Sequence, residues 1–112
     1  MCIRDRWDSV LLDAVDRRAI YLAEGLGHAI CSLEDSSTVM YLCSATYDPV
    51  REHAINPLDP ALGLTLPPDV TPVLSARDAA APSLSEAAAQ GLLPLYDECL
   101  RFYAELASKP AP

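Results

Sequence analysis

The sequence predicts a mainly β protein, a sandwich or barrel followed by C-terminal helices. Four runs rich in apolar, β-branched and aromatic residues occupy residues 7–44. Polar turns separate them at intervals of roughly 8–12 residues, which is typical of sandwiches and barrels. A proline-rich segment follows, where neither a continuous helix nor a central strand can form. The last third shows the apolar periodicity and the capping pattern of helices.

Length and composition restrict the chain to one small domain. It has 112 residues, of which 51% are hydrophobic and 21% are charged, close to ordinary globular usage. The net charge of −8 excludes duplex nucleic acid and acidic membrane surfaces as partners, because both attract cationic proteins. No apolar run approaches the ~20 residues of a membrane-spanning helix. Arg4, Asp5 and Arg6 stand where a secretory signal needs apolar residues, so we expect a cytoplasmic protein.

The cysteines predict neither a disulfide nor a metal site. They are Cys2, Cys31, Cys43 and Cys99. None belongs to a C-x-x-C pair, and no histidine stands at the spacing of a zinc site. Cys31 and Cys43 lie in apolar runs, so we expect buried, reduced thiols.

Four predicted strands alternate with three polar turns. The strands are residues 7–12, 19–23, 28–33 and 38–44. The turns are residues 13–18, 24–27 and 34–37. Both faces of the fourth strand are apolar, because Val39, Tyr41 and Cys43 alternate with Met40 and Leu42. That strand is therefore expected to be covered on both sides.

The remaining elements follow from proline and capping signals. We interpret residues 47–82 as an ordered excursion over the β body, with one short strand near residues 52–55. The capping box Ser83-x-x-Glu86 predicts a helix over residues 84–90, which Gly91 ends. A second helix begins near Pro94. Its apolar stripe is Leu95, Cys99, Phe102, Tyr103 and Leu106. Both helices are expected to pack on the β body.

Several segments, in this order, resemble the dTDP-4-dehydrorhamnose 3,5-epimerase family. They are RWDSVLL, DRRAIYLAEGLGHA, TVMYLCSATYDPVREH, INPLDPALG, LSARDAAAPSL and GLLP. The resemblance covers residues 7–104 and matches the C-terminal portion of the family. It implies a partial cupin or jelly-roll β-sandwich over residues 7–82, which includes the proline-rich excursion. C-terminal α-helices over residues 83–107 and a frayed tail at 108–112 follow. Residues 1–6 do not resemble the family, and we interpret them as an artefactual start.

The resemblance implies an isomerase of dTDP-rhamnose biosynthesis. Such enzymes convert dTDP-4-dehydro-6-deoxy-D-glucose to dTDP-4-dehydro-L-rhamnose by moving protons at C3 and C5. Both carbons adjoin the 4-keto group, so a general base and a general acid suffice through an enolate. The implied partners are a dTDP-4-keto-6-deoxy sugar as substrate and a second protomer in a homodimer. Neither a cofactor nor a metal is implied.

Two positions match the family's catalytic residues. Tyr41 matches the proton donor, and a phenol with a pKa of about 10 holds its proton at neutral pH. Asp78 matches the aspartate that orients the base histidine. The base itself belongs to a segment that matches nothing here, since His28 and His53 are the chain's histidines and neither stands in that context. We therefore expect the chain alone to be inactive.

Four positions match substrate-binding residues of the family. His28 ends a variant of the cupin P-x-G-x-x-H signature and is implied to line the pocket near the sugar and phosphate. Tyr47 is implied to stack on the thymine ring. Glu52 and Arg77 match further contacts, and Arg77 would make a charge-assisted contact near the diphosphate.

Two alternative functions stay open. A 3,4-ketoisomerase would act on the same dTDP-4-keto sugar with its acid and base placed differently, and Tyr41 together with Asp78 favours the epimerase. A non-catalytic cupin-like binding module is also compatible with an incomplete catalytic set.

Overall fold

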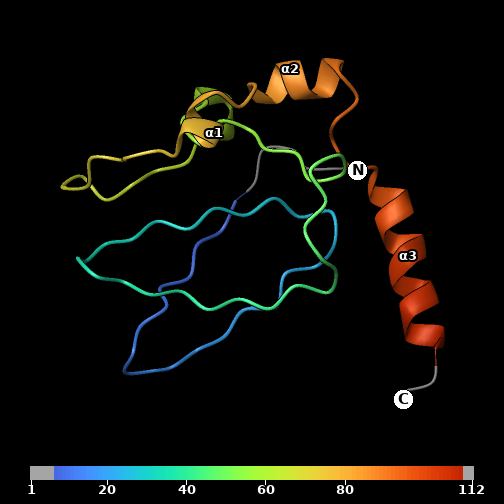
Figure 1. Ribbon diagram of the computed structural model, residues 1–112, viewed down its shortest axis with the longest axis horizontal. Helices are drawn as coiled ribbons and strands as arrows, with labels where there is room; N and C mark the ends of the chain where they lie inside the picture. The colour runs from blue at the N-terminus through green and yellow to red at the C-terminus, as the bar shows by residue number, and fades with distance from the viewer. Residues whose placement is uncertain (1–6, 110–112) are drawn as a thin grey trace. The chain divides into compact units, whose positions relative to one another are not determined.

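The structure, a computed structural model, describes residues 7–109 and divides into two compact units. The first unit comprises the described residues up to His28 and from Leu93 onward, and the second is Ala29–Leu92. The elements in chain order are the 3₁₀ helix η1 (Pro60–Leu62), α1 (Ala76–Ala79), α2 (Leu84–Ala89) and α3 (Tyr96–Ser108) (Figure 1). The start interpreted as artefactual, residues 1–6, and the last three residues of the predicted tail lie outside the described residues.

The prediction of a mainly β fold is wrong. Between residues 7 and 109 the chain contains no β-strand, so neither the partial jelly roll nor the short strand near residues 52–55 is formed. The segments predicted as strands run as long open stretches between turns (Figure 1). A strand is stabilised by backbone hydrogen bonds to a neighbouring strand. The sequence pattern indicates segments suited to a sheet, but it does not supply the neighbour.

These stretches also leave their side chains exposed. Ala87, at 1% exposure, is the one buried hydrophobic residue in the described part of the chain. Met40 and Leu42 are 90% and 95% exposed and Tyr41 is 74% exposed, so the expected two-sided cover of that segment is wrong. Cys31 and Cys43 are free, as predicted, but exposed rather than buried.

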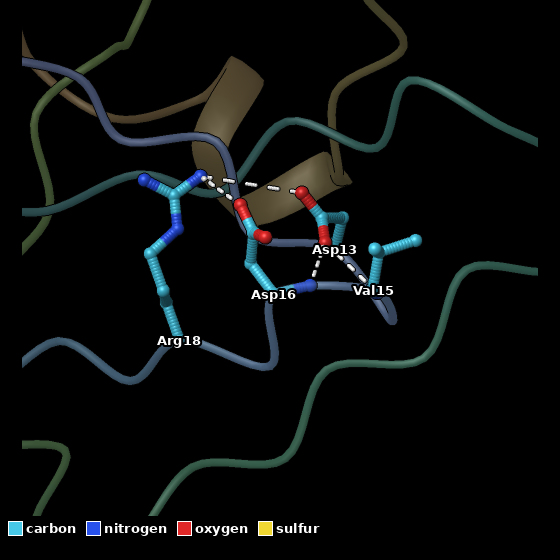
Figure 2. A network of polar contacts seen from close by, with 4 residues as sticks. All are labelled: Asp13, Val15, Asp16 and Arg18. Carbon is cyan, nitrogen blue, oxygen red and sulfur yellow. Dashed lines mark hydrogen bonds and ion pairs between the residues drawn. The ribbon is translucent and has the colours of Figure 1, made fainter.

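The first predicted turn is confirmed and is held by a carboxylate (Figure 2). Asp13 Oδ1 accepts hydrogen bonds from the backbone N–H groups of Val15 (2.9 Å) and Asp16 (2.7 Å). The backbone N–H of Arg17, at φ 52°, donates to the Asp13 carbonyl (3.2 Å). Arg18 adds an exposed ion pair with Asp16 at 3.5 Å. Aspartate favours such turns because its side chain bonds to the backbone two residues on.

The other two predicted turns are confirmed as well. The chain turns at residues 24–25 and 34–36, inside the predicted segments. Gly25 adopts φ 86°, a conformation that glycine reaches without steric cost. A Cβ at this position would collide with the Cys99 sulfur, so the close approach of α3 also requires glycine here.

The predicted helix after Ser83 is confirmed as α2. The Ser83 hydroxyl accepts from the Glu86 N–H (3.3 Å), and the Glu86 carboxylate accepts from the Ser83 N–H (2.8 Å). Gly91, at φ 69°, ends the helix. The Gly91 N–H donates to the Ala88 carbonyl (3.1 Å) and the Leu92 N–H to the Ala87 carbonyl (2.9 Å), which is a Schellman motif.

The predicted second helix is confirmed as α3, which starts two residues after Pro94. Within the first unit, Cys99 and Tyr103 are the half-buried members of its apolar stripe. The Tyr103 hydroxyl lies 3.0 Å from the Tyr21 hydroxyl and accepts from the Glu24 N–H at 3.2 Å. The expected packing of α2 and α3 on a β body is wrong, because the described chain forms no sheet. No helix within residues 7–109 has the length and apolar character to cross a membrane.

Candidate functional site

The second unit contains a hollow of about 270 Å³ that brings together residues far apart in the sequence. Its polar lining is Tyr47, Glu52, His53 and Arg77. Its apolar lining is Pro49, Ala54, Ala81, Pro82 and Leu92. Three of the four predicted substrate-binding residues therefore line one hollow.

Arg77 contacts two other residues that line this hollow. It lies on α1, whose N-cap Ser75 accepts a hydrogen bond from the Asp78 N–H. The Arg77 Nη2 donates to the Glu52 carbonyl oxygen at 3.1 Å. Its guanidinium carbon lies 5.6 Å from the centroid of the Tyr47 ring, within the range of a cation–π contact. The guanidinium therefore links both other predicted binding residues in the hollow.

Glu52 is held by a turn of its own segment. Its backbone N–H donates to the Asp48 carbonyl (2.9 Å), and its Oε1 accepts from the Asp48 N–H (3.2 Å). Tyr47, just before this turn, keeps 61% of its surface exposed. The hollow thus presents an aromatic ring, a guanidinium and a carboxylate, which together suit a flat ring carrying polar and anionic groups.

A second set of contacts fixes the segment that follows Arg77. The Asn56 N–H donates to the Pro82 carbonyl at 2.9 Å. Asp59 Oδ2 accepts from the Leu84 N–H at 2.6 Å, and its Oδ1 accepts from the Ala61 N–H at 2.9 Å. These backbone hydrogen bonds, the one from Leu84 first, lower the pKa of Asp59. Hydrogen bonds from Ser83, through its backbone and its hydroxyl, likewise lower the pKa of Glu86.

Asp78 lies beside the hollow but does not line it. Its Oδ2 accepts from the Ser75 hydroxyl at 2.7 Å, and its N–H donates to the same hydroxyl at 3.0 Å. The carboxylate is therefore engaged in the cap of α1. Its role in orienting a histidine stays a prediction.

Tyr41 and His28 also lie outside the hollow. Tyr41 belongs to the second unit and is 74% exposed. His28 is exposed and belongs to the first unit. Their roles as proton donor and pocket residue stay predictions.

The comparison with known proteins identifies the family. The profile of the family described as dTDP-4-dehydrorhamnose 3,5-epimerase matches residues 3–86, more than half of the chain. The chain belongs to the dTDP-4-dehydrorhamnose 3,5-epimerase family. This confirms the resemblance predicted from the sequence.

Curated relatives of this epimerase family match most of the chain. A dTDP-4-dehydrorhamnose 3,5-epimerase of Mycobacterium tuberculosis is 54% identical over 103 residues, covering 90% of this chain and 51% of the relative. One of Mycolicibacterium smegmatis is 54% identical over 101 residues, covering 90% and 49%. A dTDP-4-dehydro-6-deoxyglucose 3-epimerase of a Streptomyces species is 54% identical over 91 residues, covering 81% and 46%. The chain spans about half the length of these relatives.

Two features of this epimerase-family hollow were missed from the sequence. His53 lines the hollow, and its only sequence signal is its place directly after Glu52. α1 lies inside the segment interpreted as an excursion, and its sequence signal is Ser75-x-x-Asp78, in which aspartate takes the place that glutamate has in the capping box of α2. Within the described residues no three or more His, Cys, Asp or Glu side chains gather as a metal site.

Proposed function

We propose that this chain contributes to the epimerisation of a dTDP-4-keto-6-deoxy sugar, with its nucleotide part bound in the hollow of Tyr47, Glu52 and Arg77. The observation that carries the proposal is the convergence of these three residues. Each matches a substrate-binding position of the family, and Arg77 bonds to Glu52 although 25 positions separate them in the chain. Each side chain supplies a different group that a thymidine diphosphate can use: a flat ring, a carboxylate and a cation.

The geometry refines how the nucleotide would bind. Because the Arg77 guanidinium covers one face of the Tyr47 ring, the thymine is expected to stack on the opposite face. Arg77 retains donors beyond the one given to the Glu52 carbonyl, since a guanidinium has five N–H groups. These donors suit a charge-assisted contact with a phosphate oxygen.

The proposed chemistry is proton transfer next to a carbonyl. A base removes the proton from C3 or C5, the charge passes to the 4-keto oxygen as an enolate, and the Tyr41 phenol returns a proton to the opposite face. Asp78 would orient the imidazole of that base. Neither His28 nor His53 stands in the base context, so the 112-residue chain is expected to be inactive by itself.

The names of the relatives favour an epimerase and are compatible with two reactions. Matches of equal identity, 54%, carry the names of a 3,5-epimerase and of a 3-epimerase. We favour reaction at both C3 and C5, following the family description. The second candidate is reaction at C3 alone. A chain that also carries the base would distinguish the two candidates. Proton exchange at both C3 and C5 indicates the first, and exchange at C3 alone indicates the second.

We also propose that the protein works as a homodimer in the cytoplasm. The extent of exposed apolar surface supports an association between chains. The three described cysteines are free thiols, as is usual in a reducing compartment.

The decisive experiment for the site is a thermal-shift titration with dTDP. A ligand that binds the folded chain raises its melting temperature. We expect dTDP to raise the melting temperature of the unsubstituted chain and not that of Tyr47→Ala. Tyr96→Ala is the matched control, because Tyr96 on α3 is similarly exposed (55%, against 61% for Tyr47). An undiminished shift in Tyr47→Ala would refute the stacking role.

A second experiment tests the catalytic part. The chain is incubated with the 4-keto sugar nucleotide in deuterated water, and deuterium at C3 and C5 is measured by mass spectrometry. We expect no incorporation above the rate without protein. Incorporation at enzymatic rates would show that the chain carries its own base and would contradict the expectation that the chain alone is inactive.

A further inference from the structure

We infer that Asp59 is a positioning residue for the hollow. One segment carries Glu52 and ends at Asp59, and the other carries Arg77 and the apolar wall. The Asp59 carboxylate holds the second segment against the first by a hydrogen bond. This inference rests on the proposed nucleotide-binding function. The Asp-Pro motif at Asp59 belongs to the family resemblance, but the proposed chemistry gives it no role.

Hydrogen bonds align two segments within the second unit. Arg77 bonds to Glu52, Pro82 to Asn56, and Leu84 to Asp59. The first and last pairs have the same sequence separation, 25 residues. The middle pair is separated by 82 − 56 = 26 residues, so the separation is nearly constant, which means that residues 52–59 and 77–84 run side by side in the same direction. In Figure 1, η1 and α1, which follow the first segment and begin the second, are drawn next to each other.

Asp59 contributes to this alignment through both oxygens of its carboxylate. Its two carboxylate oxygens accept from two different elements, Oδ1 from Ala61 in η1 and Oδ2 from Leu84 in α2. The lowered pKa agrees with a carboxylate that is ionised while it accepts both bonds. Alanine would supply neither acceptor, and asparagine would supply one acceptor oxygen. Asp59 is thus the side chain that joins both segments at the end away from Arg77.

The hydrogen bond from Leu84 to Asp59 supports the wall of the hollow. Ala81 and Pro82 line the hollow and lie between the two fastened positions, Arg77 and Leu84. When the bond to Leu84 is lost, residues 77–84 keep only the bonds at Arg77 and Pro82. The wall can then shift, and with it the guanidinium that covers the Tyr47 ring. Asp59 does not line the hollow, so it would act through Arg77 and Pro82.

The test uses the 112-residue chain with Asp59→Ala and Asp59→Asn, followed by NMR. The first readout, without ligand, is the nuclear Overhauser effect between the Arg77 side chain and the Tyr47 ring. The second is the dissociation constant of dTDP from a titration. We expect the Arg77–Tyr47 signal to weaken in Asp59→Ala and the dissociation constant to rise about tenfold, in keeping with the loss of hydrogen bonds to a charged group. Asp59→Asn keeps one acceptor oxygen, so its signal and its dissociation constant should lie between those of Asp59→Ala and those of the unsubstituted chain.

Two controls separate positioning from general loss of stability or charge. Asp13→Ala removes the carboxylate that holds the first turn, in the other unit, and leaves the Asp59 carboxylate in place, so both readouts should stay unchanged while that turn is weakened. Asp69→Asn removes one negative charge from an exposed turn outside the aligned segments and should leave both readouts unchanged.

The inference is overturned if Asp59→Ala keeps the Arg77–Tyr47 signal, or if Asp13→Ala weakens it equally. The proposed function fails separately, if the unsubstituted chain binds no dTDP. The ligand-free signal would still decide the role of Asp59 in that case.

Discussion

Arg77 shows how a single residue connects the local backbone to the proposed binding site. Its guanidinium reaches a backbone carbonyl and an aromatic ring at once, which requires a planar group with several donors. Lysine carries the same charge on a compact ammonium and cannot stack in this way. The pairing therefore depends on the shape of the guanidinium as well as on its charge.

The first prediction concerns Arg77→Lys. We expect the dissociation constant of dTDP, measured by NMR titration, to rise several-fold, in line with the ~0.5–1 kcal/mol of an exposed cation–π contact. Arg51→Lys is the control, since Arg51 is an exposed neighbour whose backbone N–H donates to the Asp48 carbonyl within the 48–52 turn. Equal affinity in Arg77→Lys and the unsubstituted chain would show that charge alone suffices.

The second prediction concerns pH, because the pKa values of Asp59 and Glu86 are both lowered in the folded chain. A lowered carboxyl pKa stabilises the fold above the unfolded values of 3.8 and 4.5, and this stabilisation is lost as the pH falls through the folded values. We expect the melting temperature, followed by circular dichroism, to be flat from pH 7 to about pH 5 and to fall below that.

Substituted chains assign this pH dependence to its source. Asp59→Asn and Glu86→Gln remove the titrating groups, so each should flatten part of the decline below pH 5. A decline of the same size in both variants and in the unsubstituted chain would contradict the assignment.

Among the helices, turns and strands, the sequence predicts best those that local contacts determine. The capping box of α2, its end at Gly91 and the turn at Asp13 all depend on contacts within a few residues, so short patterns reveal them. The strands were wrong because a strand depends on a neighbour that no short pattern supplies. α1 was missed even though its capping pattern is local, because it is only one turn long.

The third prediction belongs to α3 and its attachment within the first unit. The hydrogen bond with Tyr21, then burial and a bond with Glu24, raise the pKa of the Tyr103 phenol, so it stays protonated and bonded at neutral pH. We expect Tyr103→Phe to speed the exchange of the Glu24 amide hydrogen, measured by NMR, because that N–H donates to the Tyr103 hydroxyl. Tyr96→Phe, on the exposed first turn of α3, should leave this exchange rate unchanged. Equal protection of the Glu24 amide in Tyr103→Phe would contradict the attachment.

For the chain as a whole, composition and structure indicate different degrees of burial. A chain that is 51% hydrophobic is expected to bury a core, yet Ala87 is the one buried hydrophobic residue among those described. The candidate site could still be predicted in part, because Tyr47, Glu52 and Arg77 were recognised from sequence segments of the family. Composition does not reveal how much of this apolar surface is covered by a partner. The chain matches about half of each relative.

The fourth prediction follows from this exposed surface. Residues 39–42 form an apolar stretch in which Met40 and Leu42 are 90% and 95% exposed. Such surface favours association between chains, and extended backbone without a neighbour adds unpaired hydrogen-bonding groups. We expect light scattering after size exclusion to show concentration-dependent association, despite the repulsion of a net charge of −8.

The double substitution of Met40→Lys with Leu42→Lys tests whether this stretch drives the association. Charged side chains are costly to bury, so the variant should associate at higher concentrations than the unsubstituted chain. The control, Thr38→Lys with Ser44→Lys, adds the same two charges at the ends of the stretch and keeps its apolar residues. If both variants shift the association equally, the effect belongs to net charge, whereas a shift confined to the first assigns it to apolar contact through Met40 and Leu42.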